Sequence, residues 1–181
     1  QKKITWSEYA VTNRKSVWVQ SGTAPQVYQH VDGKGNEANN AKEGYMLYCD
    51  GSQNPGLVFN LKVDADLCPG STMYFSAWLC DASSTGSGKS APNMDFVVTG
   101  IDDKGKEHAL TTFTTSEFGI NASMERAKWY QIMFPVKFDA GDTYHTYRLR
   151  IRNKSTSSDG NDFAIDDIRI YVQKPPVIPI Q

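Results

Sequence analysis

Apolar residues recur at every second position in one segment of this chain after another, and this period constrains the fold more than any other feature. Successive side chains of a β-strand point to opposite faces, so a period of two is typical of strands with one buried and one solvated face. No stretch of a dozen residues carries the apolar stripe of an amphipathic helix. The pattern therefore predicts an all-β protein.

Five segments show the alternation most clearly, and each gathers its apolar side chains on one face. These sets are Leu57, Phe59, Leu61 and Val63; Met73, Phe75, Ala77 and Leu79; Met94, Phe96 and Val98; Tyr130, Ile132, Phe134, Val136 and Phe138; and Tyr147, Leu149 and Ile151. Shorter strands are expected at 17–20 and 26–31, with a polar loop at 32–43. The breaks between strands hold Gly, Pro, Asn and Asp, the residues that favour turns.

The spacing of these strands predicts a two-sheet antiparallel β-sandwich of jelly-roll type, because the longer connections suit crossings between packed sheets. A chain of 181 residues is long enough for one well-cored domain, which we place at residues 1–172. The last nine residues, 173–181, contain three prolines, which prevent ladder pairing. We expect a proline-rich linker or C-terminal tail there.

The charge balance limits the class of partner. The chain has 19 Lys and Arg against 20 Asp and Glu, with a formal net charge of −1 and no basic block. This balance excludes nucleic acid and an anionic membrane as the main partner. No apolar run is long enough to span a bilayer, and residues 1–10 lack the apolar stretch of a signal peptide.

The three cysteines leave two interpretations open. Cys49, Cys68 and Cys80 have no CxxC spacing and cannot all pair within one chain. A Cys49–Cys80 bridge between neighbouring strands is one interpretation. Buried thiols that act as small hydrophobic side chains are the other.

Catalytic patterns are missing from the sequence. Nothing resembles a nucleophile elbow, a phosphate-binding loop, a zinc helix or a dinucleotide fingerprint. His30, His108 and His145 lie far apart, without ligand spacing. No sequence feature pairs Asp95, Glu117 or Glu125 across a cleft, as glycosidase chemistry requires. The sequence therefore predicts a chain that is not an enzyme.

The outward sides of several strands carry the residue types that a ligand site needs. If these strands are neighbours in one sheet, they form a surface of aromatic rings with planar hydrogen-bonding groups around them. The candidate ligand-binding residues are Tyr74, Trp78, Asp95, Trp129, Gln131, Arg148 and Arg150. Such a surface suits a sugar, whose apolar C–H face stacks on aromatic rings. Alternatively, Tyr74 and Trp78 pack under a loop or a second domain, and the arginines pair across strands with Asp95.

The closing segment GNDFAIDDIRIY, residues 160–171, places two adjacent carboxylates, Asp166 and Asp167, inside an apolar strand. Strict alternation would bury one of them, so the strand must bulge or one carboxylate must have a buried partner. In one interpretation, one Asp accepts backbone N–H bonds or pairs with Arg169 or Arg150, while the other faces water.

Four pieces in order resemble a known pattern: GYMLYCDGS, LCPGSTMYFSAWLCDAS, Trp129-Tyr130-Gln131, and RIRN followed by GNDFAIDDIRI. Over roughly residues 44–172 the chain resembles jelly-roll, galactose-binding-like modules of bacterial surface and secreted multidomain proteins, which are related in fold to the carbohydrate-binding modules of glycan-degrading enzymes. The resemblance implies an exported, extracellular or cell-surface protein, with any signal peptide outside this chain.

The resemblance also implies a structural calcium ion, because in related modules an Asp of the terminal pair often helps to hold one. Calcium prefers six to eight hard oxygen ligands. Asp166 and Asp167 match that position, with Asn161 and Asp162 as neighbours, while WSEY with Glu8 is the counterpart of the N-terminal ligand segment.

Two functions from different classes follow. The first is a non-catalytic module that binds glycan through an aromatic strand face or through loops at one edge, as a monomeric unit of a longer chain. The second is a spacer or adhesion domain whose partner is a surface protein or only its neighbours in the chain.

Overall fold

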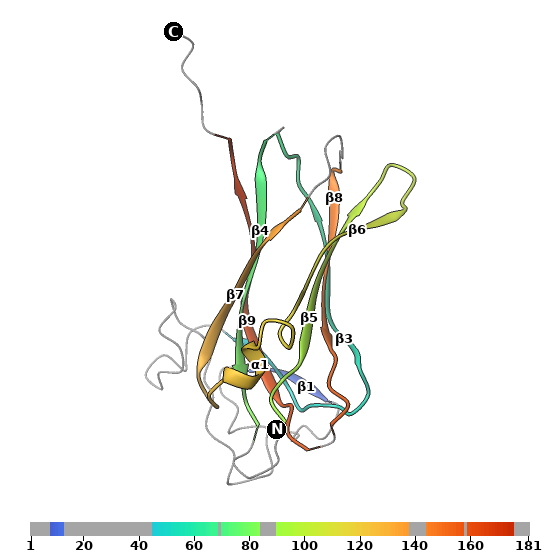
Figure 1. Ribbon diagram of the computed structural model, residues 1–181. Helices are drawn as coiled ribbons and strands as arrows, with labels where there is room; N and C mark the ends of the chain where they lie inside the picture. The colour runs from blue at the N-terminus through green and yellow to red at the C-terminus, as the bar shows by residue number, and fades with distance from the viewer. Residues whose placement is uncertain are drawn as a thin grey trace.

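In a computed structural model, the described residues are 8–12, 45–68, 70–83, 90–137, 144–157 and 159–175, and every structural statement below concerns them. Within these ranges the chain forms nine strands and the short helix α1 (Ile120–Ser123). The strands build two antiparallel sheets that face each other (Figure 1). The all-β, two-sheet jelly-roll sandwich predicted from the sequence is confirmed.

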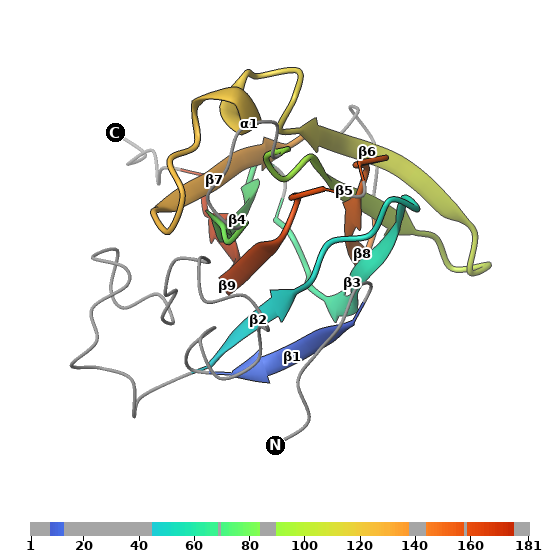
Figure 2. The same ribbon diagram turned by 90° about the horizontal axis from the view of Figure 1, so that it is seen from below.

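The two sheets take their strands from distant parts of the chain. In the five-stranded sheet the order is β1 (Tyr9–Thr12), β2 (Met46–Cys49), β9 (Phe163–Gln173), β4 (Thr72–Asp81) and β7 (Trp129–Val136). In the four-stranded sheet the order is β3 (Gly56–Asp64), β8 (Thr146–Asn153), β5 (Met94–Ile101) and β6 (Glu107–Thr114). The last strand, β9, lies between β2 and β4 (Figure 2). The chain therefore crosses repeatedly from one sheet to the other.

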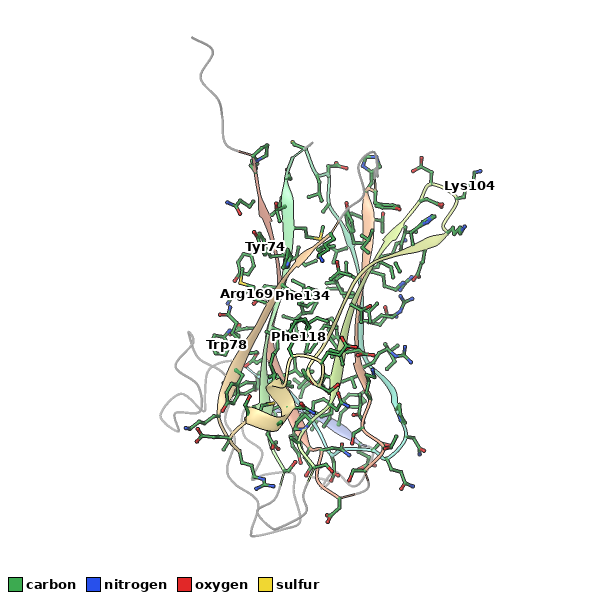
Figure 3. All side chains as sticks on the ribbon, in the orientation of Figure 1. Tyr74, Trp78, Lys104, Phe118, Phe134 and Arg169 are labelled. Carbon is green, nitrogen blue, oxygen red and sulfur yellow. The ribbon has the colours of Figure 1, made fainter. Side chains whose placement is uncertain are left out.

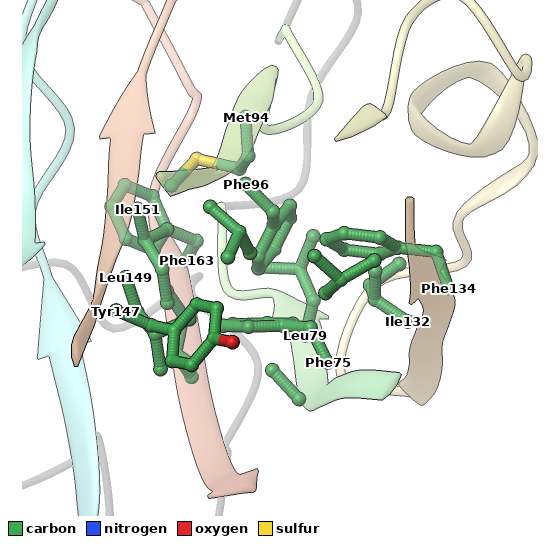
Figure 4. Close-up of a cluster of buried hydrophobic side chains, with 14 of the residues drawn as sticks. Phe75, Leu79, Met94, Phe96, Ile132, Phe134, Tyr147, Leu149, Ile151 and Phe163 are labelled. Carbon is green, nitrogen blue, oxygen red and sulfur yellow. The ribbon is translucent and has the colours of Figure 1, made fainter. Parts of the chain in front are cut away.

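The core fills the space between the sheets, and it confirms most of the predicted faces. The buried residues come from alternate positions of β4, β5, β7, β8 and β9 (Figure 4). Phe75 is fully buried, with its ring centroid 5.6 Å from that of Phe96 and 5.3 Å from that of Phe134. These aromatic contacts tie the five-stranded sheet to the four-stranded sheet, because Phe96 lies on β5.

The predicted face of β3 is wrong at one end. The pairing of β3 with β8 shifts between Leu57 and Phe59, which is a bulge. The extra residue turns Leu57 to the outer side, where it pairs with Arg152 and is 54% exposed, while Val58 packs on the core. A one-residue shift reverses the faces on one side of a bulge, and alternation alone does not locate it.

The paired carboxylates of β9 also lie at a bulge, one of the two alternatives that the sequence left open. Ser76 pairs with Arg169 and Trp78 with Asp166, so the register shifts between these positions. Asp167 adopts a left-handed conformation, with φ of 48°. Asp166 Oδ1 accepts the N–H of Asp167 at 2.7 Å, and Arg169 donates to Asp167 Oδ1 at 3.2 Å. Protein donors therefore reach both carboxylates.

All three cysteines are free thiols, so the bridge is excluded. Cys49 packs in the main core, whereas Cys80 belongs to a second, smaller cluster with Met46 and Tyr48. Burial, with the nearby Asp162 and Asp50 carboxylates, raises the pKa of Cys49 to about 12. Cys68, in contrast, is exposed.

Several predicted features lie outside the described residues: the strands at 17–20 and 26–31, the loop at 32–43, Phe138, and residues 176–181 of the tail. Within the described ranges, no helix has the length and apolar composition needed to cross a bilayer.

Candidate functional site

The predicted ligand-binding residues are divided between the two outer faces of the sandwich. Tyr74, Trp78, Trp129 and Gln131 lie on β4 and β7 of the five-stranded sheet, whereas Asp95, Arg148 and Arg150 lie on β5 and β8 of the four-stranded sheet. The prediction of one continuous surface is therefore wrong. Alternation assigns a side chain to a side of its strand, but it does not say which strands share a sheet.

The aromatic face is the outer side of the five-stranded sheet that carries Tyr74, Ser76, Trp78, Gln131, Arg169 and Tyr171. On it, Trp78 pairs with Gln131 on β7 and with Asp166 on β9. Tyr74 pairs with Tyr171, which is 41% exposed. Tyr74, Arg169 and Trp78 follow one another along the side that points away from the second sheet (Figure 3).

Hydrogen bonds organise the polar groups of the aromatic face. Gln131 Nε2 donates to Ser76 Oγ at 3.3 Å, and the Tyr74 hydroxyl donates to Gln173 Oε1 at 3.5 Å. Tyr74 and Trp78 are half-buried rather than fully buried. Their rings are therefore partly open to solvent, and the interpretation that they are completely covered does not hold for the described residues.

The ends of this face differ from the sequence expectation. Trp129 lies on the same side of β7 as Gln131, at the end of the face, and packs against the smaller buried cluster around Met46 and Tyr48. Arg169 and Tyr171 belong to the face and were missed. Alternation along IRIY, with Ile168 and Ile170 packed on the core, is the signal that identifies them.

The four predicted calcium ligands do not meet at one point. Asp162 Oδ1 accepts the Gly51 N–H at 2.8 Å, and the fully buried Asn161 donates from Nδ2 to the Ser157 carbonyl at 2.6 Å. Asp166 lies about 13 Å further along the chain at strand spacing. No group of three or more His, Cys, Asp and Glu side chains in the described part of the chain is arranged to hold a metal. These four residues do not fit a shared site, and calcium binding itself stays a prediction.

The arginine face is the outer side of the four-stranded sheet, and its charged residues are Lys62, Asp64, Asp95, Glu107, Arg148, Arg150, Arg152 and Lys154. Glu107, on the edge strand β6, binds two of the arginines. Arg148 Nε donates to its Oε1 at 2.8 Å, and Arg150 donates to Oε2 at 2.7 Å and to Oε1 at 3.0 Å. Thr99 Oγ1 donates to Oε2 at 3.2 Å. The arginines pair across strands, as one interpretation predicted, but with Glu107.

The predicted partner, Asp95, has other contacts. It is 9% exposed and accepts a hydrogen bond from Thr114 Oγ1 at 2.6 Å, while Lys154 Nζ lies 3.5 Å from the same oxygen. Asp95 and Glu107 thus hold different cations.

The contacts of Glu107 predict a pH-dependent contribution to stability. The hydrogen bond from Arg150, assisted by that from Arg148, lowers the pKa of Glu107 from 4.5 to about 2 against the opposing effect of partial burial. A lowered folded-state pKa stabilises the fold above pH 4.5, and this stabilisation is lost as the pH falls towards 2. We expect Glu107→Gln to lower the free energy of unfolding by about 1 kcal/mol at neutral pH, a value reduced for partial exposure.

Urea unfolding of the parent and of Glu107→Gln at a series of pH values measures this contribution. The difference between them should shrink as the pH falls from 4.5 towards 2. Glu117→Gln is the matched control, because Glu117 is exposed and its replacement should change stability by less than about 0.5 kcal/mol. A difference that stays constant over this pH range would contradict the assignment.

A pocket of about 240 Å³ lies between the start of β1 and the loop at 50–56, and one of its lining residues, Leu57, pairs with Arg152 of the arginine face. Its lining includes Glu8, Tyr9, Asp50, Leu57 and Phe163. This volume is below that of most ligand pockets, which start at about 300 Å³.

Comparison with known proteins identifies similar folds but does not identify a function. No protein family's sequence profile matches the chain, and no curated protein matches it in sequence.

A Stig cyclase from Fischerella sp. TAU superposes with a TM-score of 0.55 at 11% identity, over 93% of this chain and 86% of that chain. A cyclase from the same organism gives 0.52 at 12% identity, over 76% and 68%. A xylan-binding domain from Paenibacillus barcinonensis gives 0.45 at 9% identity, over 97% and 91%. At these identities the similarity concerns the fold alone, and the similar folds include both a cyclase and a carbohydrate-binding domain.

Proposed function

We propose that this chain is a non-catalytic carbohydrate-binding module of an exported protein, and that the aromatic face is its glycan-binding surface. The observation that carries the proposal is that Tyr74, Trp78 and Tyr171 lie on the outer side of one sheet and are partly exposed to solvent. Tyr74 and Tyr171 pair directly across strands β4 and β9. The resemblance of the closing GNDFAIDDIRI segment to exported modules supports the cellular location.

The chemistry of the face matches that of a sugar chain. Rings on a rigid sheet offer flat apolar surfaces to the C–H faces of sugar rings. Gln131, Arg169 and Asp166 lie among the rings and offer amide, guanidinium and carboxylate groups to hydroxyls. Tyr74 and Trp78 are separated by four residues of strand, about 13 Å. The face can therefore contact more than one sugar unit of an extended chain.

Two of the carboxylates considered for catalysis have partners within the protein. Asp95 is buried against Thr114, and Glu125 pairs with Lys128.

Affinity gel electrophoresis in neutral plant polysaccharides, xylan and mixed-linkage glucan, tests the proposal. We expect at least one polysaccharide to retard the parent chain and Trp78→Ala to weaken that retention about tenfold, the equivalent of one lost stacking contact of roughly 1.4 kcal/mol. Phe118→Ala is the control, since Phe118 is an exposed aromatic residue outside the aromatic face. Unchanged retention of Trp78→Ala would exclude the aromatic face, and a folded parent that no polysaccharide retards would favour the spacer or adhesion function.

A further inference from the structure

The arginine face has an excess of positive charge on a chain whose total charge is slightly negative. Alternate residues of β8 point to the outer side, and Lys62 on β3 pairs with Arg148. Five cations, Lys62, Arg148, Arg150, Arg152 and Lys154, accompany three carboxylates, Asp64, Asp95 and Glu107. The remaining excess is two positive charges on one side of one sheet.

The three carboxylates are already occupied. Glu107 binds Arg148 and Arg150, as described above. Asp64 Oδ1 accepts a hydrogen bond from Thr146 Oγ1 at 2.8 Å. Asp95 accepts from Thr114 and lies beside Lys154. Asp64 keeps its negative charge, because its partner is a neutral hydroxyl, but neither Lys62 nor Arg152 forms an ion pair with any of the three acids in the described ranges.

Lys62 and Arg152 are the cations that remain available. Both are exposed, and neither side chain makes a hydrogen bond or ion pair with any residue in the described ranges. Lys62 pairs with Arg148 on the neighbouring strand, and Arg152 lies four residues further along β8. The two available charges are thus about 13 Å apart along the strand direction, with the Glu107-bound guanidinium groups between them.

Glu107 also holds the two central arginines in position. Arg150 donates two hydrogen bonds to one carboxylate, and Arg148 donates from Nε to Glu107 and from Nη1 to Asn60 Oδ1 at 3.1 Å. These bonds fix the planes of the guanidinium groups while about a quarter of each side chain stays exposed. Fixed, planar guanidinium groups recognise carboxylates with little loss of side-chain entropy.

The residue types of the arginine face favour an acidic polysaccharide over single-stranded nucleic acid as its ligand. Its other outer positions carry Val97, Thr99, Ile101 and Thr112, and none of its described outer positions carries an aromatic ring. Single-stranded nucleic acid is usually bound by stacking its bases on aromatic side chains, which this face does not offer. A chain of sugars with a carboxylate on each unit needs only cations at intervals along a flat surface.

We propose that the arginine face binds an acidic polysaccharide through the carboxylates of its uronic acid units. The inference goes beyond the proposed function, because it concerns the opposite sheet and does not depend on the aromatic face. A module of this kind would contact neutral glycan with one face and acidic glycan with the other.

Binding of polygalacturonate, measured by affinity electrophoresis and by calorimetry at low and at physiological salt, tests the inference. We expect the parent to bind and the affinity to fall as salt rises. The double variant Lys62→Gln with Arg152→Gln should bind at least tenfold more weakly. The control Lys104→Gln with Lys174→Gln removes two charges from exposed positions outside the face and should change the affinity by less than twofold. Lys104 lies at the β5–β6 turn (Figure 3).

Three further measurements complete the test. Fully methyl-esterified polygalacturonate, which keeps the sugar chain but not the charge, should bind the parent and the variant with Lys62→Gln and Arg152→Gln equally, because it has no carboxylate for the arginine face. Trp78→Ala should bind polygalacturonate like the parent, so failure of the aromatic face and failure of the arginine face are distinguishable. The inference is overturned if the parent does not bind polygalacturonate, if both double variants bind equally, or if polyglutamate or single-stranded DNA binds as tightly, which would indicate general attraction of anions.

Discussion

Replacing Phe75 by alanine should lower the free energy of unfolding by about 3 to 5 kcal/mol, the usual cost of emptying a buried aromatic site. Phe75 has no exposed surface and contacts the rings of Phe96 and Phe134. The residue lies on β4 and Phe96 on β5, so the ring joins the two sheets. The loss is a large part of the 5 to 15 kcal/mol that stabilises a typical domain.

Denaturant unfolding followed by circular dichroism measures this loss, and Phe118→Ala is the matched control. Phe118 is 64% exposed, although its ring stacks on that of Phe113 at 4.5 Å. Its removal leaves no buried cavity, and we expect a loss below about 1.5 kcal/mol. If the two variants were destabilised equally, Phe75 would not be a central core residue.

Gly51→Ala should lower the free energy of unfolding by about 3 kcal/mol. A Cβ atom at residue 51 would lie 1.7 Å from Asn161 Oδ1 and 2.6 Å from the Asn161 carbonyl oxygen. Asn161 cannot move away easily, because it is fully buried and its Nδ2 donates to the Ser157 carbonyl. The added methyl group must therefore displace backbone at the junction of the 50–56 loop with β9.

Gly56→Ala provides the control for this position. The nearest atom to a Cβ at residue 56 is the Asn54 carbonyl oxygen at 3.8 Å, an ordinary contact distance. Thermal unfolding of both variants should show a clearly lower midpoint for Gly51→Ala and a change within about 0.5 kcal/mol for Gly56→Ala. A Gly51→Ala protein as stable as the parent would show that the loop and Asn161 do not pack as described.

The sequence predicted individual strands well because their pattern is local. The apolar sets of β4, β5 and β8 were identified residue by residue, and all of their members are buried. A bulge of β9 at its paired carboxylates was one of two alternatives that the sequence offered, since neighbouring residues of a regular strand cannot both face water. The bulge in β3 escaped prediction, because Leu57 and Val58 are both apolar and give no sign of which one points inward.

The candidate site was predicted in part. Tyr74, Trp78 and Gln131 do share a face, because β4 and β7 are neighbours. Arg148 and Arg150 point to the opposite side of the molecule and bind Glu107, a residue that sequence analysis had not selected. Glu107 lies on β6, about forty positions away from the arginines, and no local pattern connects such distant residues.

The sequence alone was enough to predict the class of fold, most of the strands and, away from the bulges, the side of its strand on which a residue lies, because side-chain alternation is a property of the extended backbone. Only the tertiary structure decided which strands share a sheet, and therefore that Trp78 lies beside Gln131 and Asp166 and away from Arg148. Strand neighbours are selected by pairing between distant segments and by burial of both inner faces together. That selection divided one predicted ligand surface into two, an aromatic face on one sheet and an arginine face on the other.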